Sequence, residues 1–106
     1  MIIIKGSYIQ YAEGYDKDDI TRIEIVKALK DLVSMDDEHS AFWVGVYGSD
    51  NVEFILELHK NLTLFGKFGE DDNYKIQLQS LEQSKFYFDL LLTGMIEELI
   101  ENIKGY

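Results

Sequence analysis

Four strand-like runs between residues 41 and 79 constrain the fold of this chain more than any other feature. Segment 41–47 is rich in aromatic and β-branched residues, and segments 52–58, 62–68 and 74–79 alternate apolar with polar side chains. Alternation is typical of a strand with one buried face. The runs are joined by short turns, whereas parallel neighbours need a crossover of about a dozen residues or more. The sequence therefore predicts an antiparallel meander.

The N-terminal third predicts a strand followed by a helix. Residues 1–4 and 7–11 are strand-like on either side of Gly6, which indicates one strand with a bulge or a short hairpin. A helix is expected over 19–34, with Asp16 or Asp18 capping its first amides. Its apolar residues recur at helical spacing: Ile20, Ile23, Val26, Leu29, Leu32 and Val33.

The C-terminal third predicts two helical segments. Ser80 and Gln83 match a capping box, so a helix should run over 81–92, and Thr93-Gly94 should interrupt it before a second segment over 95–104. We therefore expect a single α+β domain over residues 1–106. Its antiparallel β-sheet meander has helices packed on one face, one after the N-terminal strand and one interrupted C-terminal helix.

Net charge narrows the possible partners. Twenty acidic against ten basic residues give a charge of −10. Such a field repels nucleic acid and anionic membrane and speeds encounter with a basic protein, although solubility alone is an equal alternative. The basic residues form no stripe for phosphates, and no apolar run approaches the roughly 20 residues of a membrane span. We expect neither nucleic acid nor membrane as a partner.

Motifs for catalysis or metal binding are absent from the sequence. There is no cysteine, and a calcium loop beginning at Asp16 fails because Thr21 and Lys27 stand where glycine and glutamate are required. His39 and His59 are the two histidines, more typical of loop surfaces than of a zinc site. Asp89 lies on a polar helical stripe. We therefore expect no catalytic residue, no metal and no cofactor, and a protein that is not an enzyme.

The acidic residues, by contrast, form clusters. Asp36, Asp37 and Glu38 follow the first helix, and Glu70, Asp71 and Asp72 occupy a turn that should share one end of the sheet with turn 48–51. We predict these six residues as the partner-binding residues. Aromatic anchors could come from Tyr8, Tyr11, Tyr15, Trp43 or Tyr47, although we favour a core position for Trp43.

One resemblance bears on function. Phe42-Trp43-Val44-Gly45-Val46-Tyr47, the two strands after it and the later Leu90-Leu91-Leu92-Thr93-Gly94 resemble the small acidic immunity proteins of bacterial polymorphic toxin and contact-dependent inhibition systems. The similarity spans about residues 41–94, and the acidic segment 95–104 departs from it. It implies a cytoplasmic antitoxin that binds one cognate toxin tightly and blocks its active site or substrate cleft.

Several functional alternatives stay open at this point. The main hypothesis is a non-enzymatic acidic protein that neutralises a basic toxin or nuclease as a monomer in a 1:1 complex. A phage-encoded inhibitor of a bacterial defence nuclease would have the same character. A small-molecule-binding domain would need a pocket between sheet and helices, lined by carboxylates or histidines. A homodimer built along a sheet edge is the remaining possibility.

Overall fold

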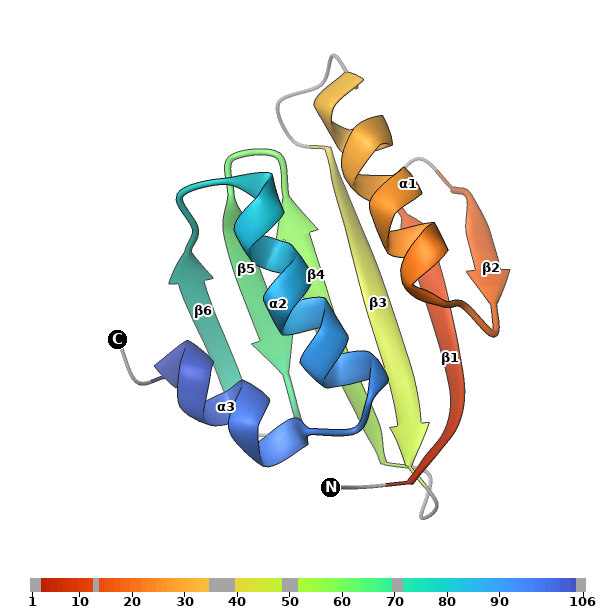
Figure 1. The fold of residues 1–106 in the computed structure, drawn as a ribbon, viewed down its shortest axis with the longest axis vertical. Coiled ribbons are helices and arrows are strands. Elements are labelled where there is room, and N and C mark those ends of the chain that lie inside the picture. Colours follow the sequence, from red (N-terminus) through yellow and green to blue (C-terminus); the bar gives the residue numbers. More distant parts are fainter. Residues whose placement is uncertain (1–2, 13, 35–39, 49–51, 70–71, 105–106) are drawn as a thin grey trace.

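The sheet is the frame of the molecule (Figure 1). A computed structural model describes residues 3–12, 14–34, 40–48, 52–69 and 72–104. Within them lies a six-stranded sheet of order β2-β1-β3-β4-β5-β6 in which every neighbouring pair is antiparallel. The strands are β1 (Ile4–Tyr11), β2 (Asp16–Asp18), β3 (Ala41–Gly48), β4 (Glu53–His59), β5 (Thr63–Lys67) and β6 (Asn73–Gln77). The predicted antiparallel meander is confirmed.

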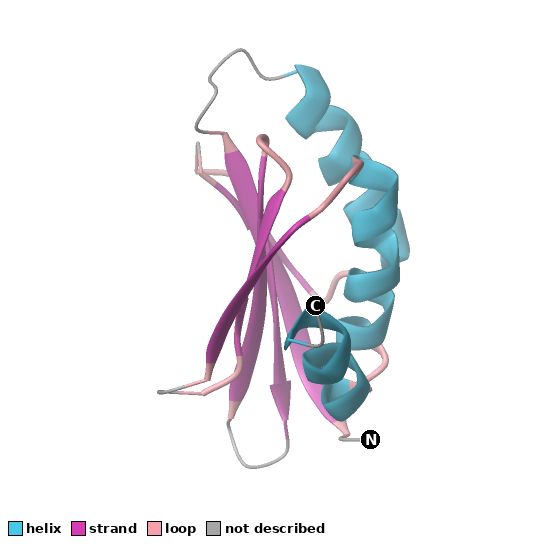
Figure 2. Cartoon of the chain, turned by 90° about the vertical axis from the view of Figure 1, so that its left-hand side faces the viewer, coloured by secondary structure: helices cyan, strands magenta, loops and turns pink. Residues whose placement is uncertain are grey.

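Helices α1 (Arg22–Ser34), α2 (Leu81–Leu92) and α3 (Ile96–Lys104) all cover the same face of the sheet (Figure 2). The α+β class, the helix that follows the N-terminal strand region and the interrupted C-terminal helix are confirmed. The described residues fit within 38 × 31 × 23 Å. None of their helices has the length and apolar character that a bilayer crossing requires.

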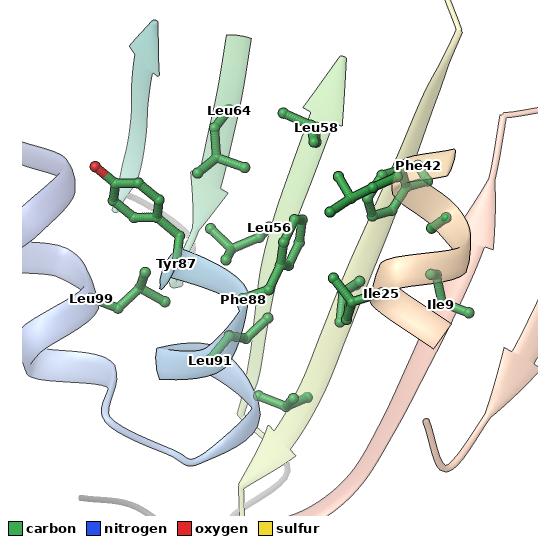
Figure 3. Packing of buried hydrophobic residues seen from close by; sticks show 14 of the residues in the cluster. Ile9, Ile25, Phe42, Leu56, Leu58, Leu64, Tyr87, Phe88, Leu91 and Leu99 are labelled. Atoms are coloured by element: carbon green, nitrogen blue, oxygen red, sulfur yellow. The ribbon is translucent and has the colours of Figure 1, made fainter. Parts of the chain in front are cut away.

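The core lies between this helical layer and the sheet (Figure 3). Phe42 of β3 stacks on Phe88 of α2, with ring centroids 5.5 Å apart and planes 24° from parallel. Leu56, Leu58 and Leu64 of the neighbouring strands are fully buried beside them. These residues are the apolar members of the alternating strand pattern. Because alternate side chains point to the same face, the helices cover the face on which the apolar residues lie.

Strand β1 is a single strand with an irregularity, which was one of the two readings of the N-terminus. Its pairing with β3 shifts register between Ile4 and Gly6, and Ile9 and Tyr11 then point into the core. The shift allows the strand to start on one register and finish on another, as a bulge does.

The start of α1 differs from the prediction. Asp16 and Asp18 do not cap the helix, because they belong to β2, which pairs with β1. After β2 the chain remains hydrogen-bonded to β1 as far as Ile20, whose amide donates to the Ser7 hydroxyl at 3.0 Å. The helix therefore begins only at Arg22, beyond the expected residue 19.

The cap of α1 is formed by Thr21 and Glu24. The Thr21 amide and hydroxyl donate to the Glu24 carboxylate at 2.7 and 2.8 Å, and Lys17 of β2 donates to it at 2.8 Å. These hydrogen bonds hold the pKa of Glu24 at about 2, with the Lys17 bond as the largest cause. Glu24 thus joins the edge strand to the helix.

The buried face of α1 is also rotated from the predicted one. Ile25, Ala28, Leu29 and Leu32 are buried, whereas Ile23 and Val33 are 78% and 63% exposed. Apolar residues lie around more than half of this helix, so spacing alone did not select the face.

The C-terminal helices follow their sequence signals closely. The Ser80 side chain accepts from the Gln83 amide at the start of α2. The Gln83 side chain accepts from the Gln79 amide. Gly94 ends the helix in a left-handed conformation with φ of 79°, which glycine adopts without a Cβ clash.

Two neighbouring phenylalanines of α2 give a matched test of the core. Phe88→Ala should lower the free energy of unfolding by about 3–5 kcal/mol, because it empties a fully buried site. Phe86→Ala, at a side chain that is 51% exposed, should change it by about 0.5 kcal/mol or less. Urea unfolding followed by circular dichroism measures both. Equal losses would contradict this placement of the core.

The Glu24 cap predicts a pH dependence. Its pKa is lower in the folded chain than the ordinary 4.5, so its contribution is complete above pH 4.5 and is lost as the pH falls towards about 2. Glu24→Gln should flatten this part of the stability curve, measured by thermal unfolding at a series of pH values. Glu97→Gln, at an exposed position in the first turn of α3, is the control and should leave the curve unchanged.

Candidate functional site

The sheet has a second face that no described helix covers (Figure 2), here called the open face. Directly paired residues on neighbouring strands point to the same side of a sheet. The pairings therefore define two rows across the open face. The tryptophan row is Asp16, Gln10, Trp43, Glu57, Phe65 and Lys75, and the tyrosine row is Asp18, Tyr8, Gly45, Ile55, Lys67 and Asn73.

Trp43 lies in the middle of the first row, so the expectation that it belongs to the core is wrong. Phe42 and Val44 on either side of it face the helices and are buried. The Trp43 indole is half-buried on the open face, and its Nε1 donates to Gln10 Oε1 at 2.5 Å. Strand β3 has apolar residues on both faces, so its composition did not reveal which residues face inward.

The second row is organised around Gly45. A Cβ at this position would lie 2.3 Å from the Tyr8 ring, so the ring lies directly over the glycine backbone. Tyr47 lies two residues further along β3, its ring centroid 5.7 Å from that of Tyr8. Glu53 of β4 is paired directly with Tyr47, and its carboxylate interacts with both phenols. The absence of a side chain at Gly45 thus allows two tyrosines and an acid to form one cluster.

This cluster perturbs the ionisation of both tyrosines. Burial, followed by the negative charge of Glu53, raises the pKa of Tyr8 far above its usual range. The hydrogen bond to Glu53, followed by burial, raises the pKa of Tyr47. Burial disfavours the charged phenolate, and the negative charge of Glu53 favours a neutral phenol beside it.

A hollow of ≈ 280 Å³ opens beside the cluster. It is lined by Tyr8, Gln10, Asp16, Asp18 and Tyr47. This volume is just below the ~300–1,000 Å³ of typical small-molecule sites. Aromatic rings and carboxylates are the groups that receive a lysine or arginine side chain. Among the described residues no cation pairs with Asp16 or Asp18, and Lys17 between them turns to Glu24.

Charge on the open face changes sign across the sheet. Asp16 and Asp18 lie on β2 beside the hollow, and Glu53 and Glu57 lie on β4, on the other side of β3. The bases of the two rows, Lys67 and Lys75, lie on β5 and β6. The open face therefore has an acidic, aromatic half and a basic edge.

The predicted acidic clusters can be placed only in part. Asp36, Asp37, Glu38, Glu70 and Asp71 lie outside the described residues. Asp72 is exposed, and its carbonyl accepts from the Phe68 amide at 2.9 Å.

Topology nevertheless separates the residues that flank these clusters. Lys67 and Asn73 pair at the end of the sheet where β3 finishes, the end shared with Gly48 and Val52 as predicted. Helix α1 ends at Ser34 and β3 starts at Ala41, and both of these points lie at the other end of the sheet (Figure 1). The described residues that flank the two predicted clusters thus lie at opposite ends of the sheet.

The described histidine and acid candidates, His59 and Asp89, each lie beside one charged or titratable neighbour. His39 lies outside the described residues, and His59 Nε2 lies 2.6 Å from Glu57 Oε2, with Phe65 edge-on to the imidazole at 5.0 Å. Asp89 is on the exposed side of α2, as predicted, and pairs with Arg22 at 3.0 Å. Across the described ranges, no three His, Asp or Glu residues gather in a way that could hold a metal ion.

The aromatic candidates differ in exposure and in the face of the sheet on which they lie. Tyr11 is buried, and its hydroxyl donates to Asp31 at 2.8 Å, so it cannot reach a partner. Tyr15 is 42% exposed and lies beneath Lys27, whose Nζ is 5.1 Å from the ring centroid. Of the five candidate anchors, Tyr8, Trp43 and Tyr47 are brought together on the open face.

Comparisons with protein-family models, with curated proteins and with solved structures found no match to this chain.

The tyrosine cluster yields a titration test. Glu53→Gln should lower the pKa of both phenols because it removes the negative charge that favours their neutral form. Near-ultraviolet difference absorbance follows phenolate formation, and Tyr47→Phe identifies its share. Glu57→Gln on the same strand face is the control. An unchanged tyrosine titration in Glu53→Gln would contradict the cluster.

Proposed function

We propose that this chain is a non-enzymatic binding protein that docks the acidic, aromatic half of its open face onto a basic protein. The observation that supports this most directly is Trp43, a large aromatic side chain placed on an uncovered sheet face instead of in the core. It shares its face of β3 with Tyr47, which is 39% exposed, and its indole donates to Gln10, which lines the hollow together with two carboxylates. Tyrosine and tryptophan are the residues that most often dominate binding energy at interfaces.

The two kinds of residue would have different tasks. The aromatic side chains would supply most of the affinity by excluding water at the centre of the contact. The hollow beside Asp16 and Asp18 would receive one lysine or arginine of the partner, because neither carboxylate has a cationic partner within the described part of the chain. The net charge of −10 would speed the encounter. Asp36-Asp37-Glu38 and Glu70-Asp71-Asp72 remain proposed as steering residues.

The most concrete form of this proposal is a cytoplasmic immunity protein. Carboxylates interleaved with aromatic rings offer a nucleic-acid enzyme the charge and the stacking surfaces of its own substrate. A nuclease-type toxin with a basic cleft would therefore be blocked in a 1:1 complex, in line with the resemblance of residues 41–94 to toxin-immunity proteins. A phage-encoded inhibitor of a defence nuclease would use the same surface chemistry on a different enzyme.

A small-molecule site between the sheet and the helices has less support. The interface between the two layers is filled by apolar side chains such as Leu56, Phe88 and Leu91, all of them fully buried. A hollow of ≈ 570 Å³ lies at one end of the layers, but Asp89, the carboxylate in its wall, is already paired with Arg22.

The test measures binding to the basic toxin domain encoded beside this gene, or to the host defence nuclease if the gene lies in a phage genome. Trp43→Ala should weaken binding by at least about 2 kcal/mol, or roughly thirtyfold in Kd, mainly through faster dissociation. Val33→Ala, an exposed apolar residue on the helical side, is the matched control and should bind like the unmodified chain.

Charge reversal separates steering from anchoring. Asp16→Lys with Asp18→Lys, and reversal of each predicted acidic cluster, should slow association and flatten its dependence on salt while dissociation changes less. Stopped-flow association at several salt concentrations measures this. If association rates are unchanged and Trp43→Ala binds like Val33→Ala, the open face is not the docking surface.

A further inference from the structure

Strand β6 leaves a row of backbone groups without ladder partners. It pairs with β5 on one side and ends the strand order on the other. The Phe68 amide donates to the Asp72 carbonyl and the Leu78 amide to the Leu62 carbonyl. Because antiparallel ladders alternate, residues 72, 74, 76 and 78 direct their backbone groups to β5. The N–H and C=O groups of Asn73, Lys75 and Gln77 therefore point outward from the sheet edge.

The two edges of the sheet differ in how they could pair. Strand β2 at the far edge has three residues, all exposed, and a short charged edge discourages pairing. Strand β6 has five residues, close to the usual strand length, and a groove of ≈ 690 Å³ runs beside it. The groove is bounded by Ile76 of β6, by Phe86 of α2 and by Asn102 of α3. Phe86 is 51% exposed there, so an apolar side chain could cover it.

We propose that the β6 edge and this groove bind an extended segment of another polypeptide as a seventh strand. The inference concerns a different surface from the docking half of the open face and does not rest on the proposed function. Outward backbone groups would pair with the segment, as in known strand-addition complexes. Side chains of the segment that turn to the helical side would meet Ile76 and Phe86. Those on the other side would lie opposite Lys75 on the open face.

Charge specifies the segment further. Lys75 and nearby Lys67 have no carboxylate partner among the described residues. Opposite charges on directly paired residues stabilise a strand pair, whereas like charges destabilise it. The bound segment therefore alternates apolar with polar residues and places an aspartate or glutamate opposite Lys75.

A second copy of this chain fits the edge less well. Symmetric antiparallel pairing centred on Lys75 would set two lysines opposite each other, and each copy brings a charge of −10. Lys75 thus acts against self-pairing while it favours an acidic strand, which is how an interface rejects a wrong partner.

The test uses short synthetic peptides of alternating threonine and valine with one central glutamate. Two-dimensional amide NMR at millimolar peptide should show shifts concentrated at Asn73, Lys75 and Gln77. A peptide with central lysine should bind about two- to fivefold more weakly, the range expected of one cross-strand charge pair. A peptide N-methylated at its centre should not bind, because it cannot pair with the edge.

A charge exchange on the protein completes the test. Lys75→Glu should reverse the preference between the glutamate and lysine peptides by a similar factor. Lys30→Glu, the same change at an exposed lysine of α1 that does not line the groove, should leave the preference as it was. The proposal is overturned if no peptide shifts these amides, if the shifts map to β2, or if Lys75→Glu keeps the original preference. Sedimentation showing a dimer that Lys75→Glu alters would overturn it as well.

Discussion

Burial of one sheet face under three helices is the interaction on which the rest of this structure depends. The stacked pair of Phe42 and Phe88 joins the central strand to α2, and the leucines of β4 and β5 extend the same layer. Because side chains alternate along a strand, a strand that buries one set of residues must present the other set to solvent. Once Phe42 and Val44 face the helices, Trp43 has to lie on the opposite side. Which side chains lie on the open face is thus a consequence of how the core packs.

The sequence predicted most of this architecture because its signals are local. Alternation marked the four meander strands, and Ser80 with Gln83 marked the start of α2. The three charged residues of β2 carry no such signal. That strand forms because its backbone completes a ladder with β1 and because Ser7 holds Ile20. The same tertiary contacts move the start of α1 to Arg22, which local capping preferences could not show.

The sequence indicated several residues of the candidate site but not how they are arranged in space. Tyr8, Trp43 and Tyr47 were recognisable as candidate anchors, but their proximity depends on the register between β1 and β3, which includes an irregularity near Gly6. The role of Gly45 was equally hidden, since a glycine in a strand does not reveal which ring will lie over it. Acidic clusters in loops were easier to count than acids spread over paired strands. The sequence therefore indicated binding residues in the loops and did not indicate the open face.

Asp16 and Asp18 lie at one end of the strand order, and Lys67 and Lys75 lie toward the other. Because salt screens exposed charges beyond about 8–10 Å, a bound polycation responds to the charges directly beneath it. A cationic partner would therefore settle toward β2 and away from the lysines of β5 and β6. The opposite border of the sheet would stay accessible, so two different polypeptides could be held at once without competing.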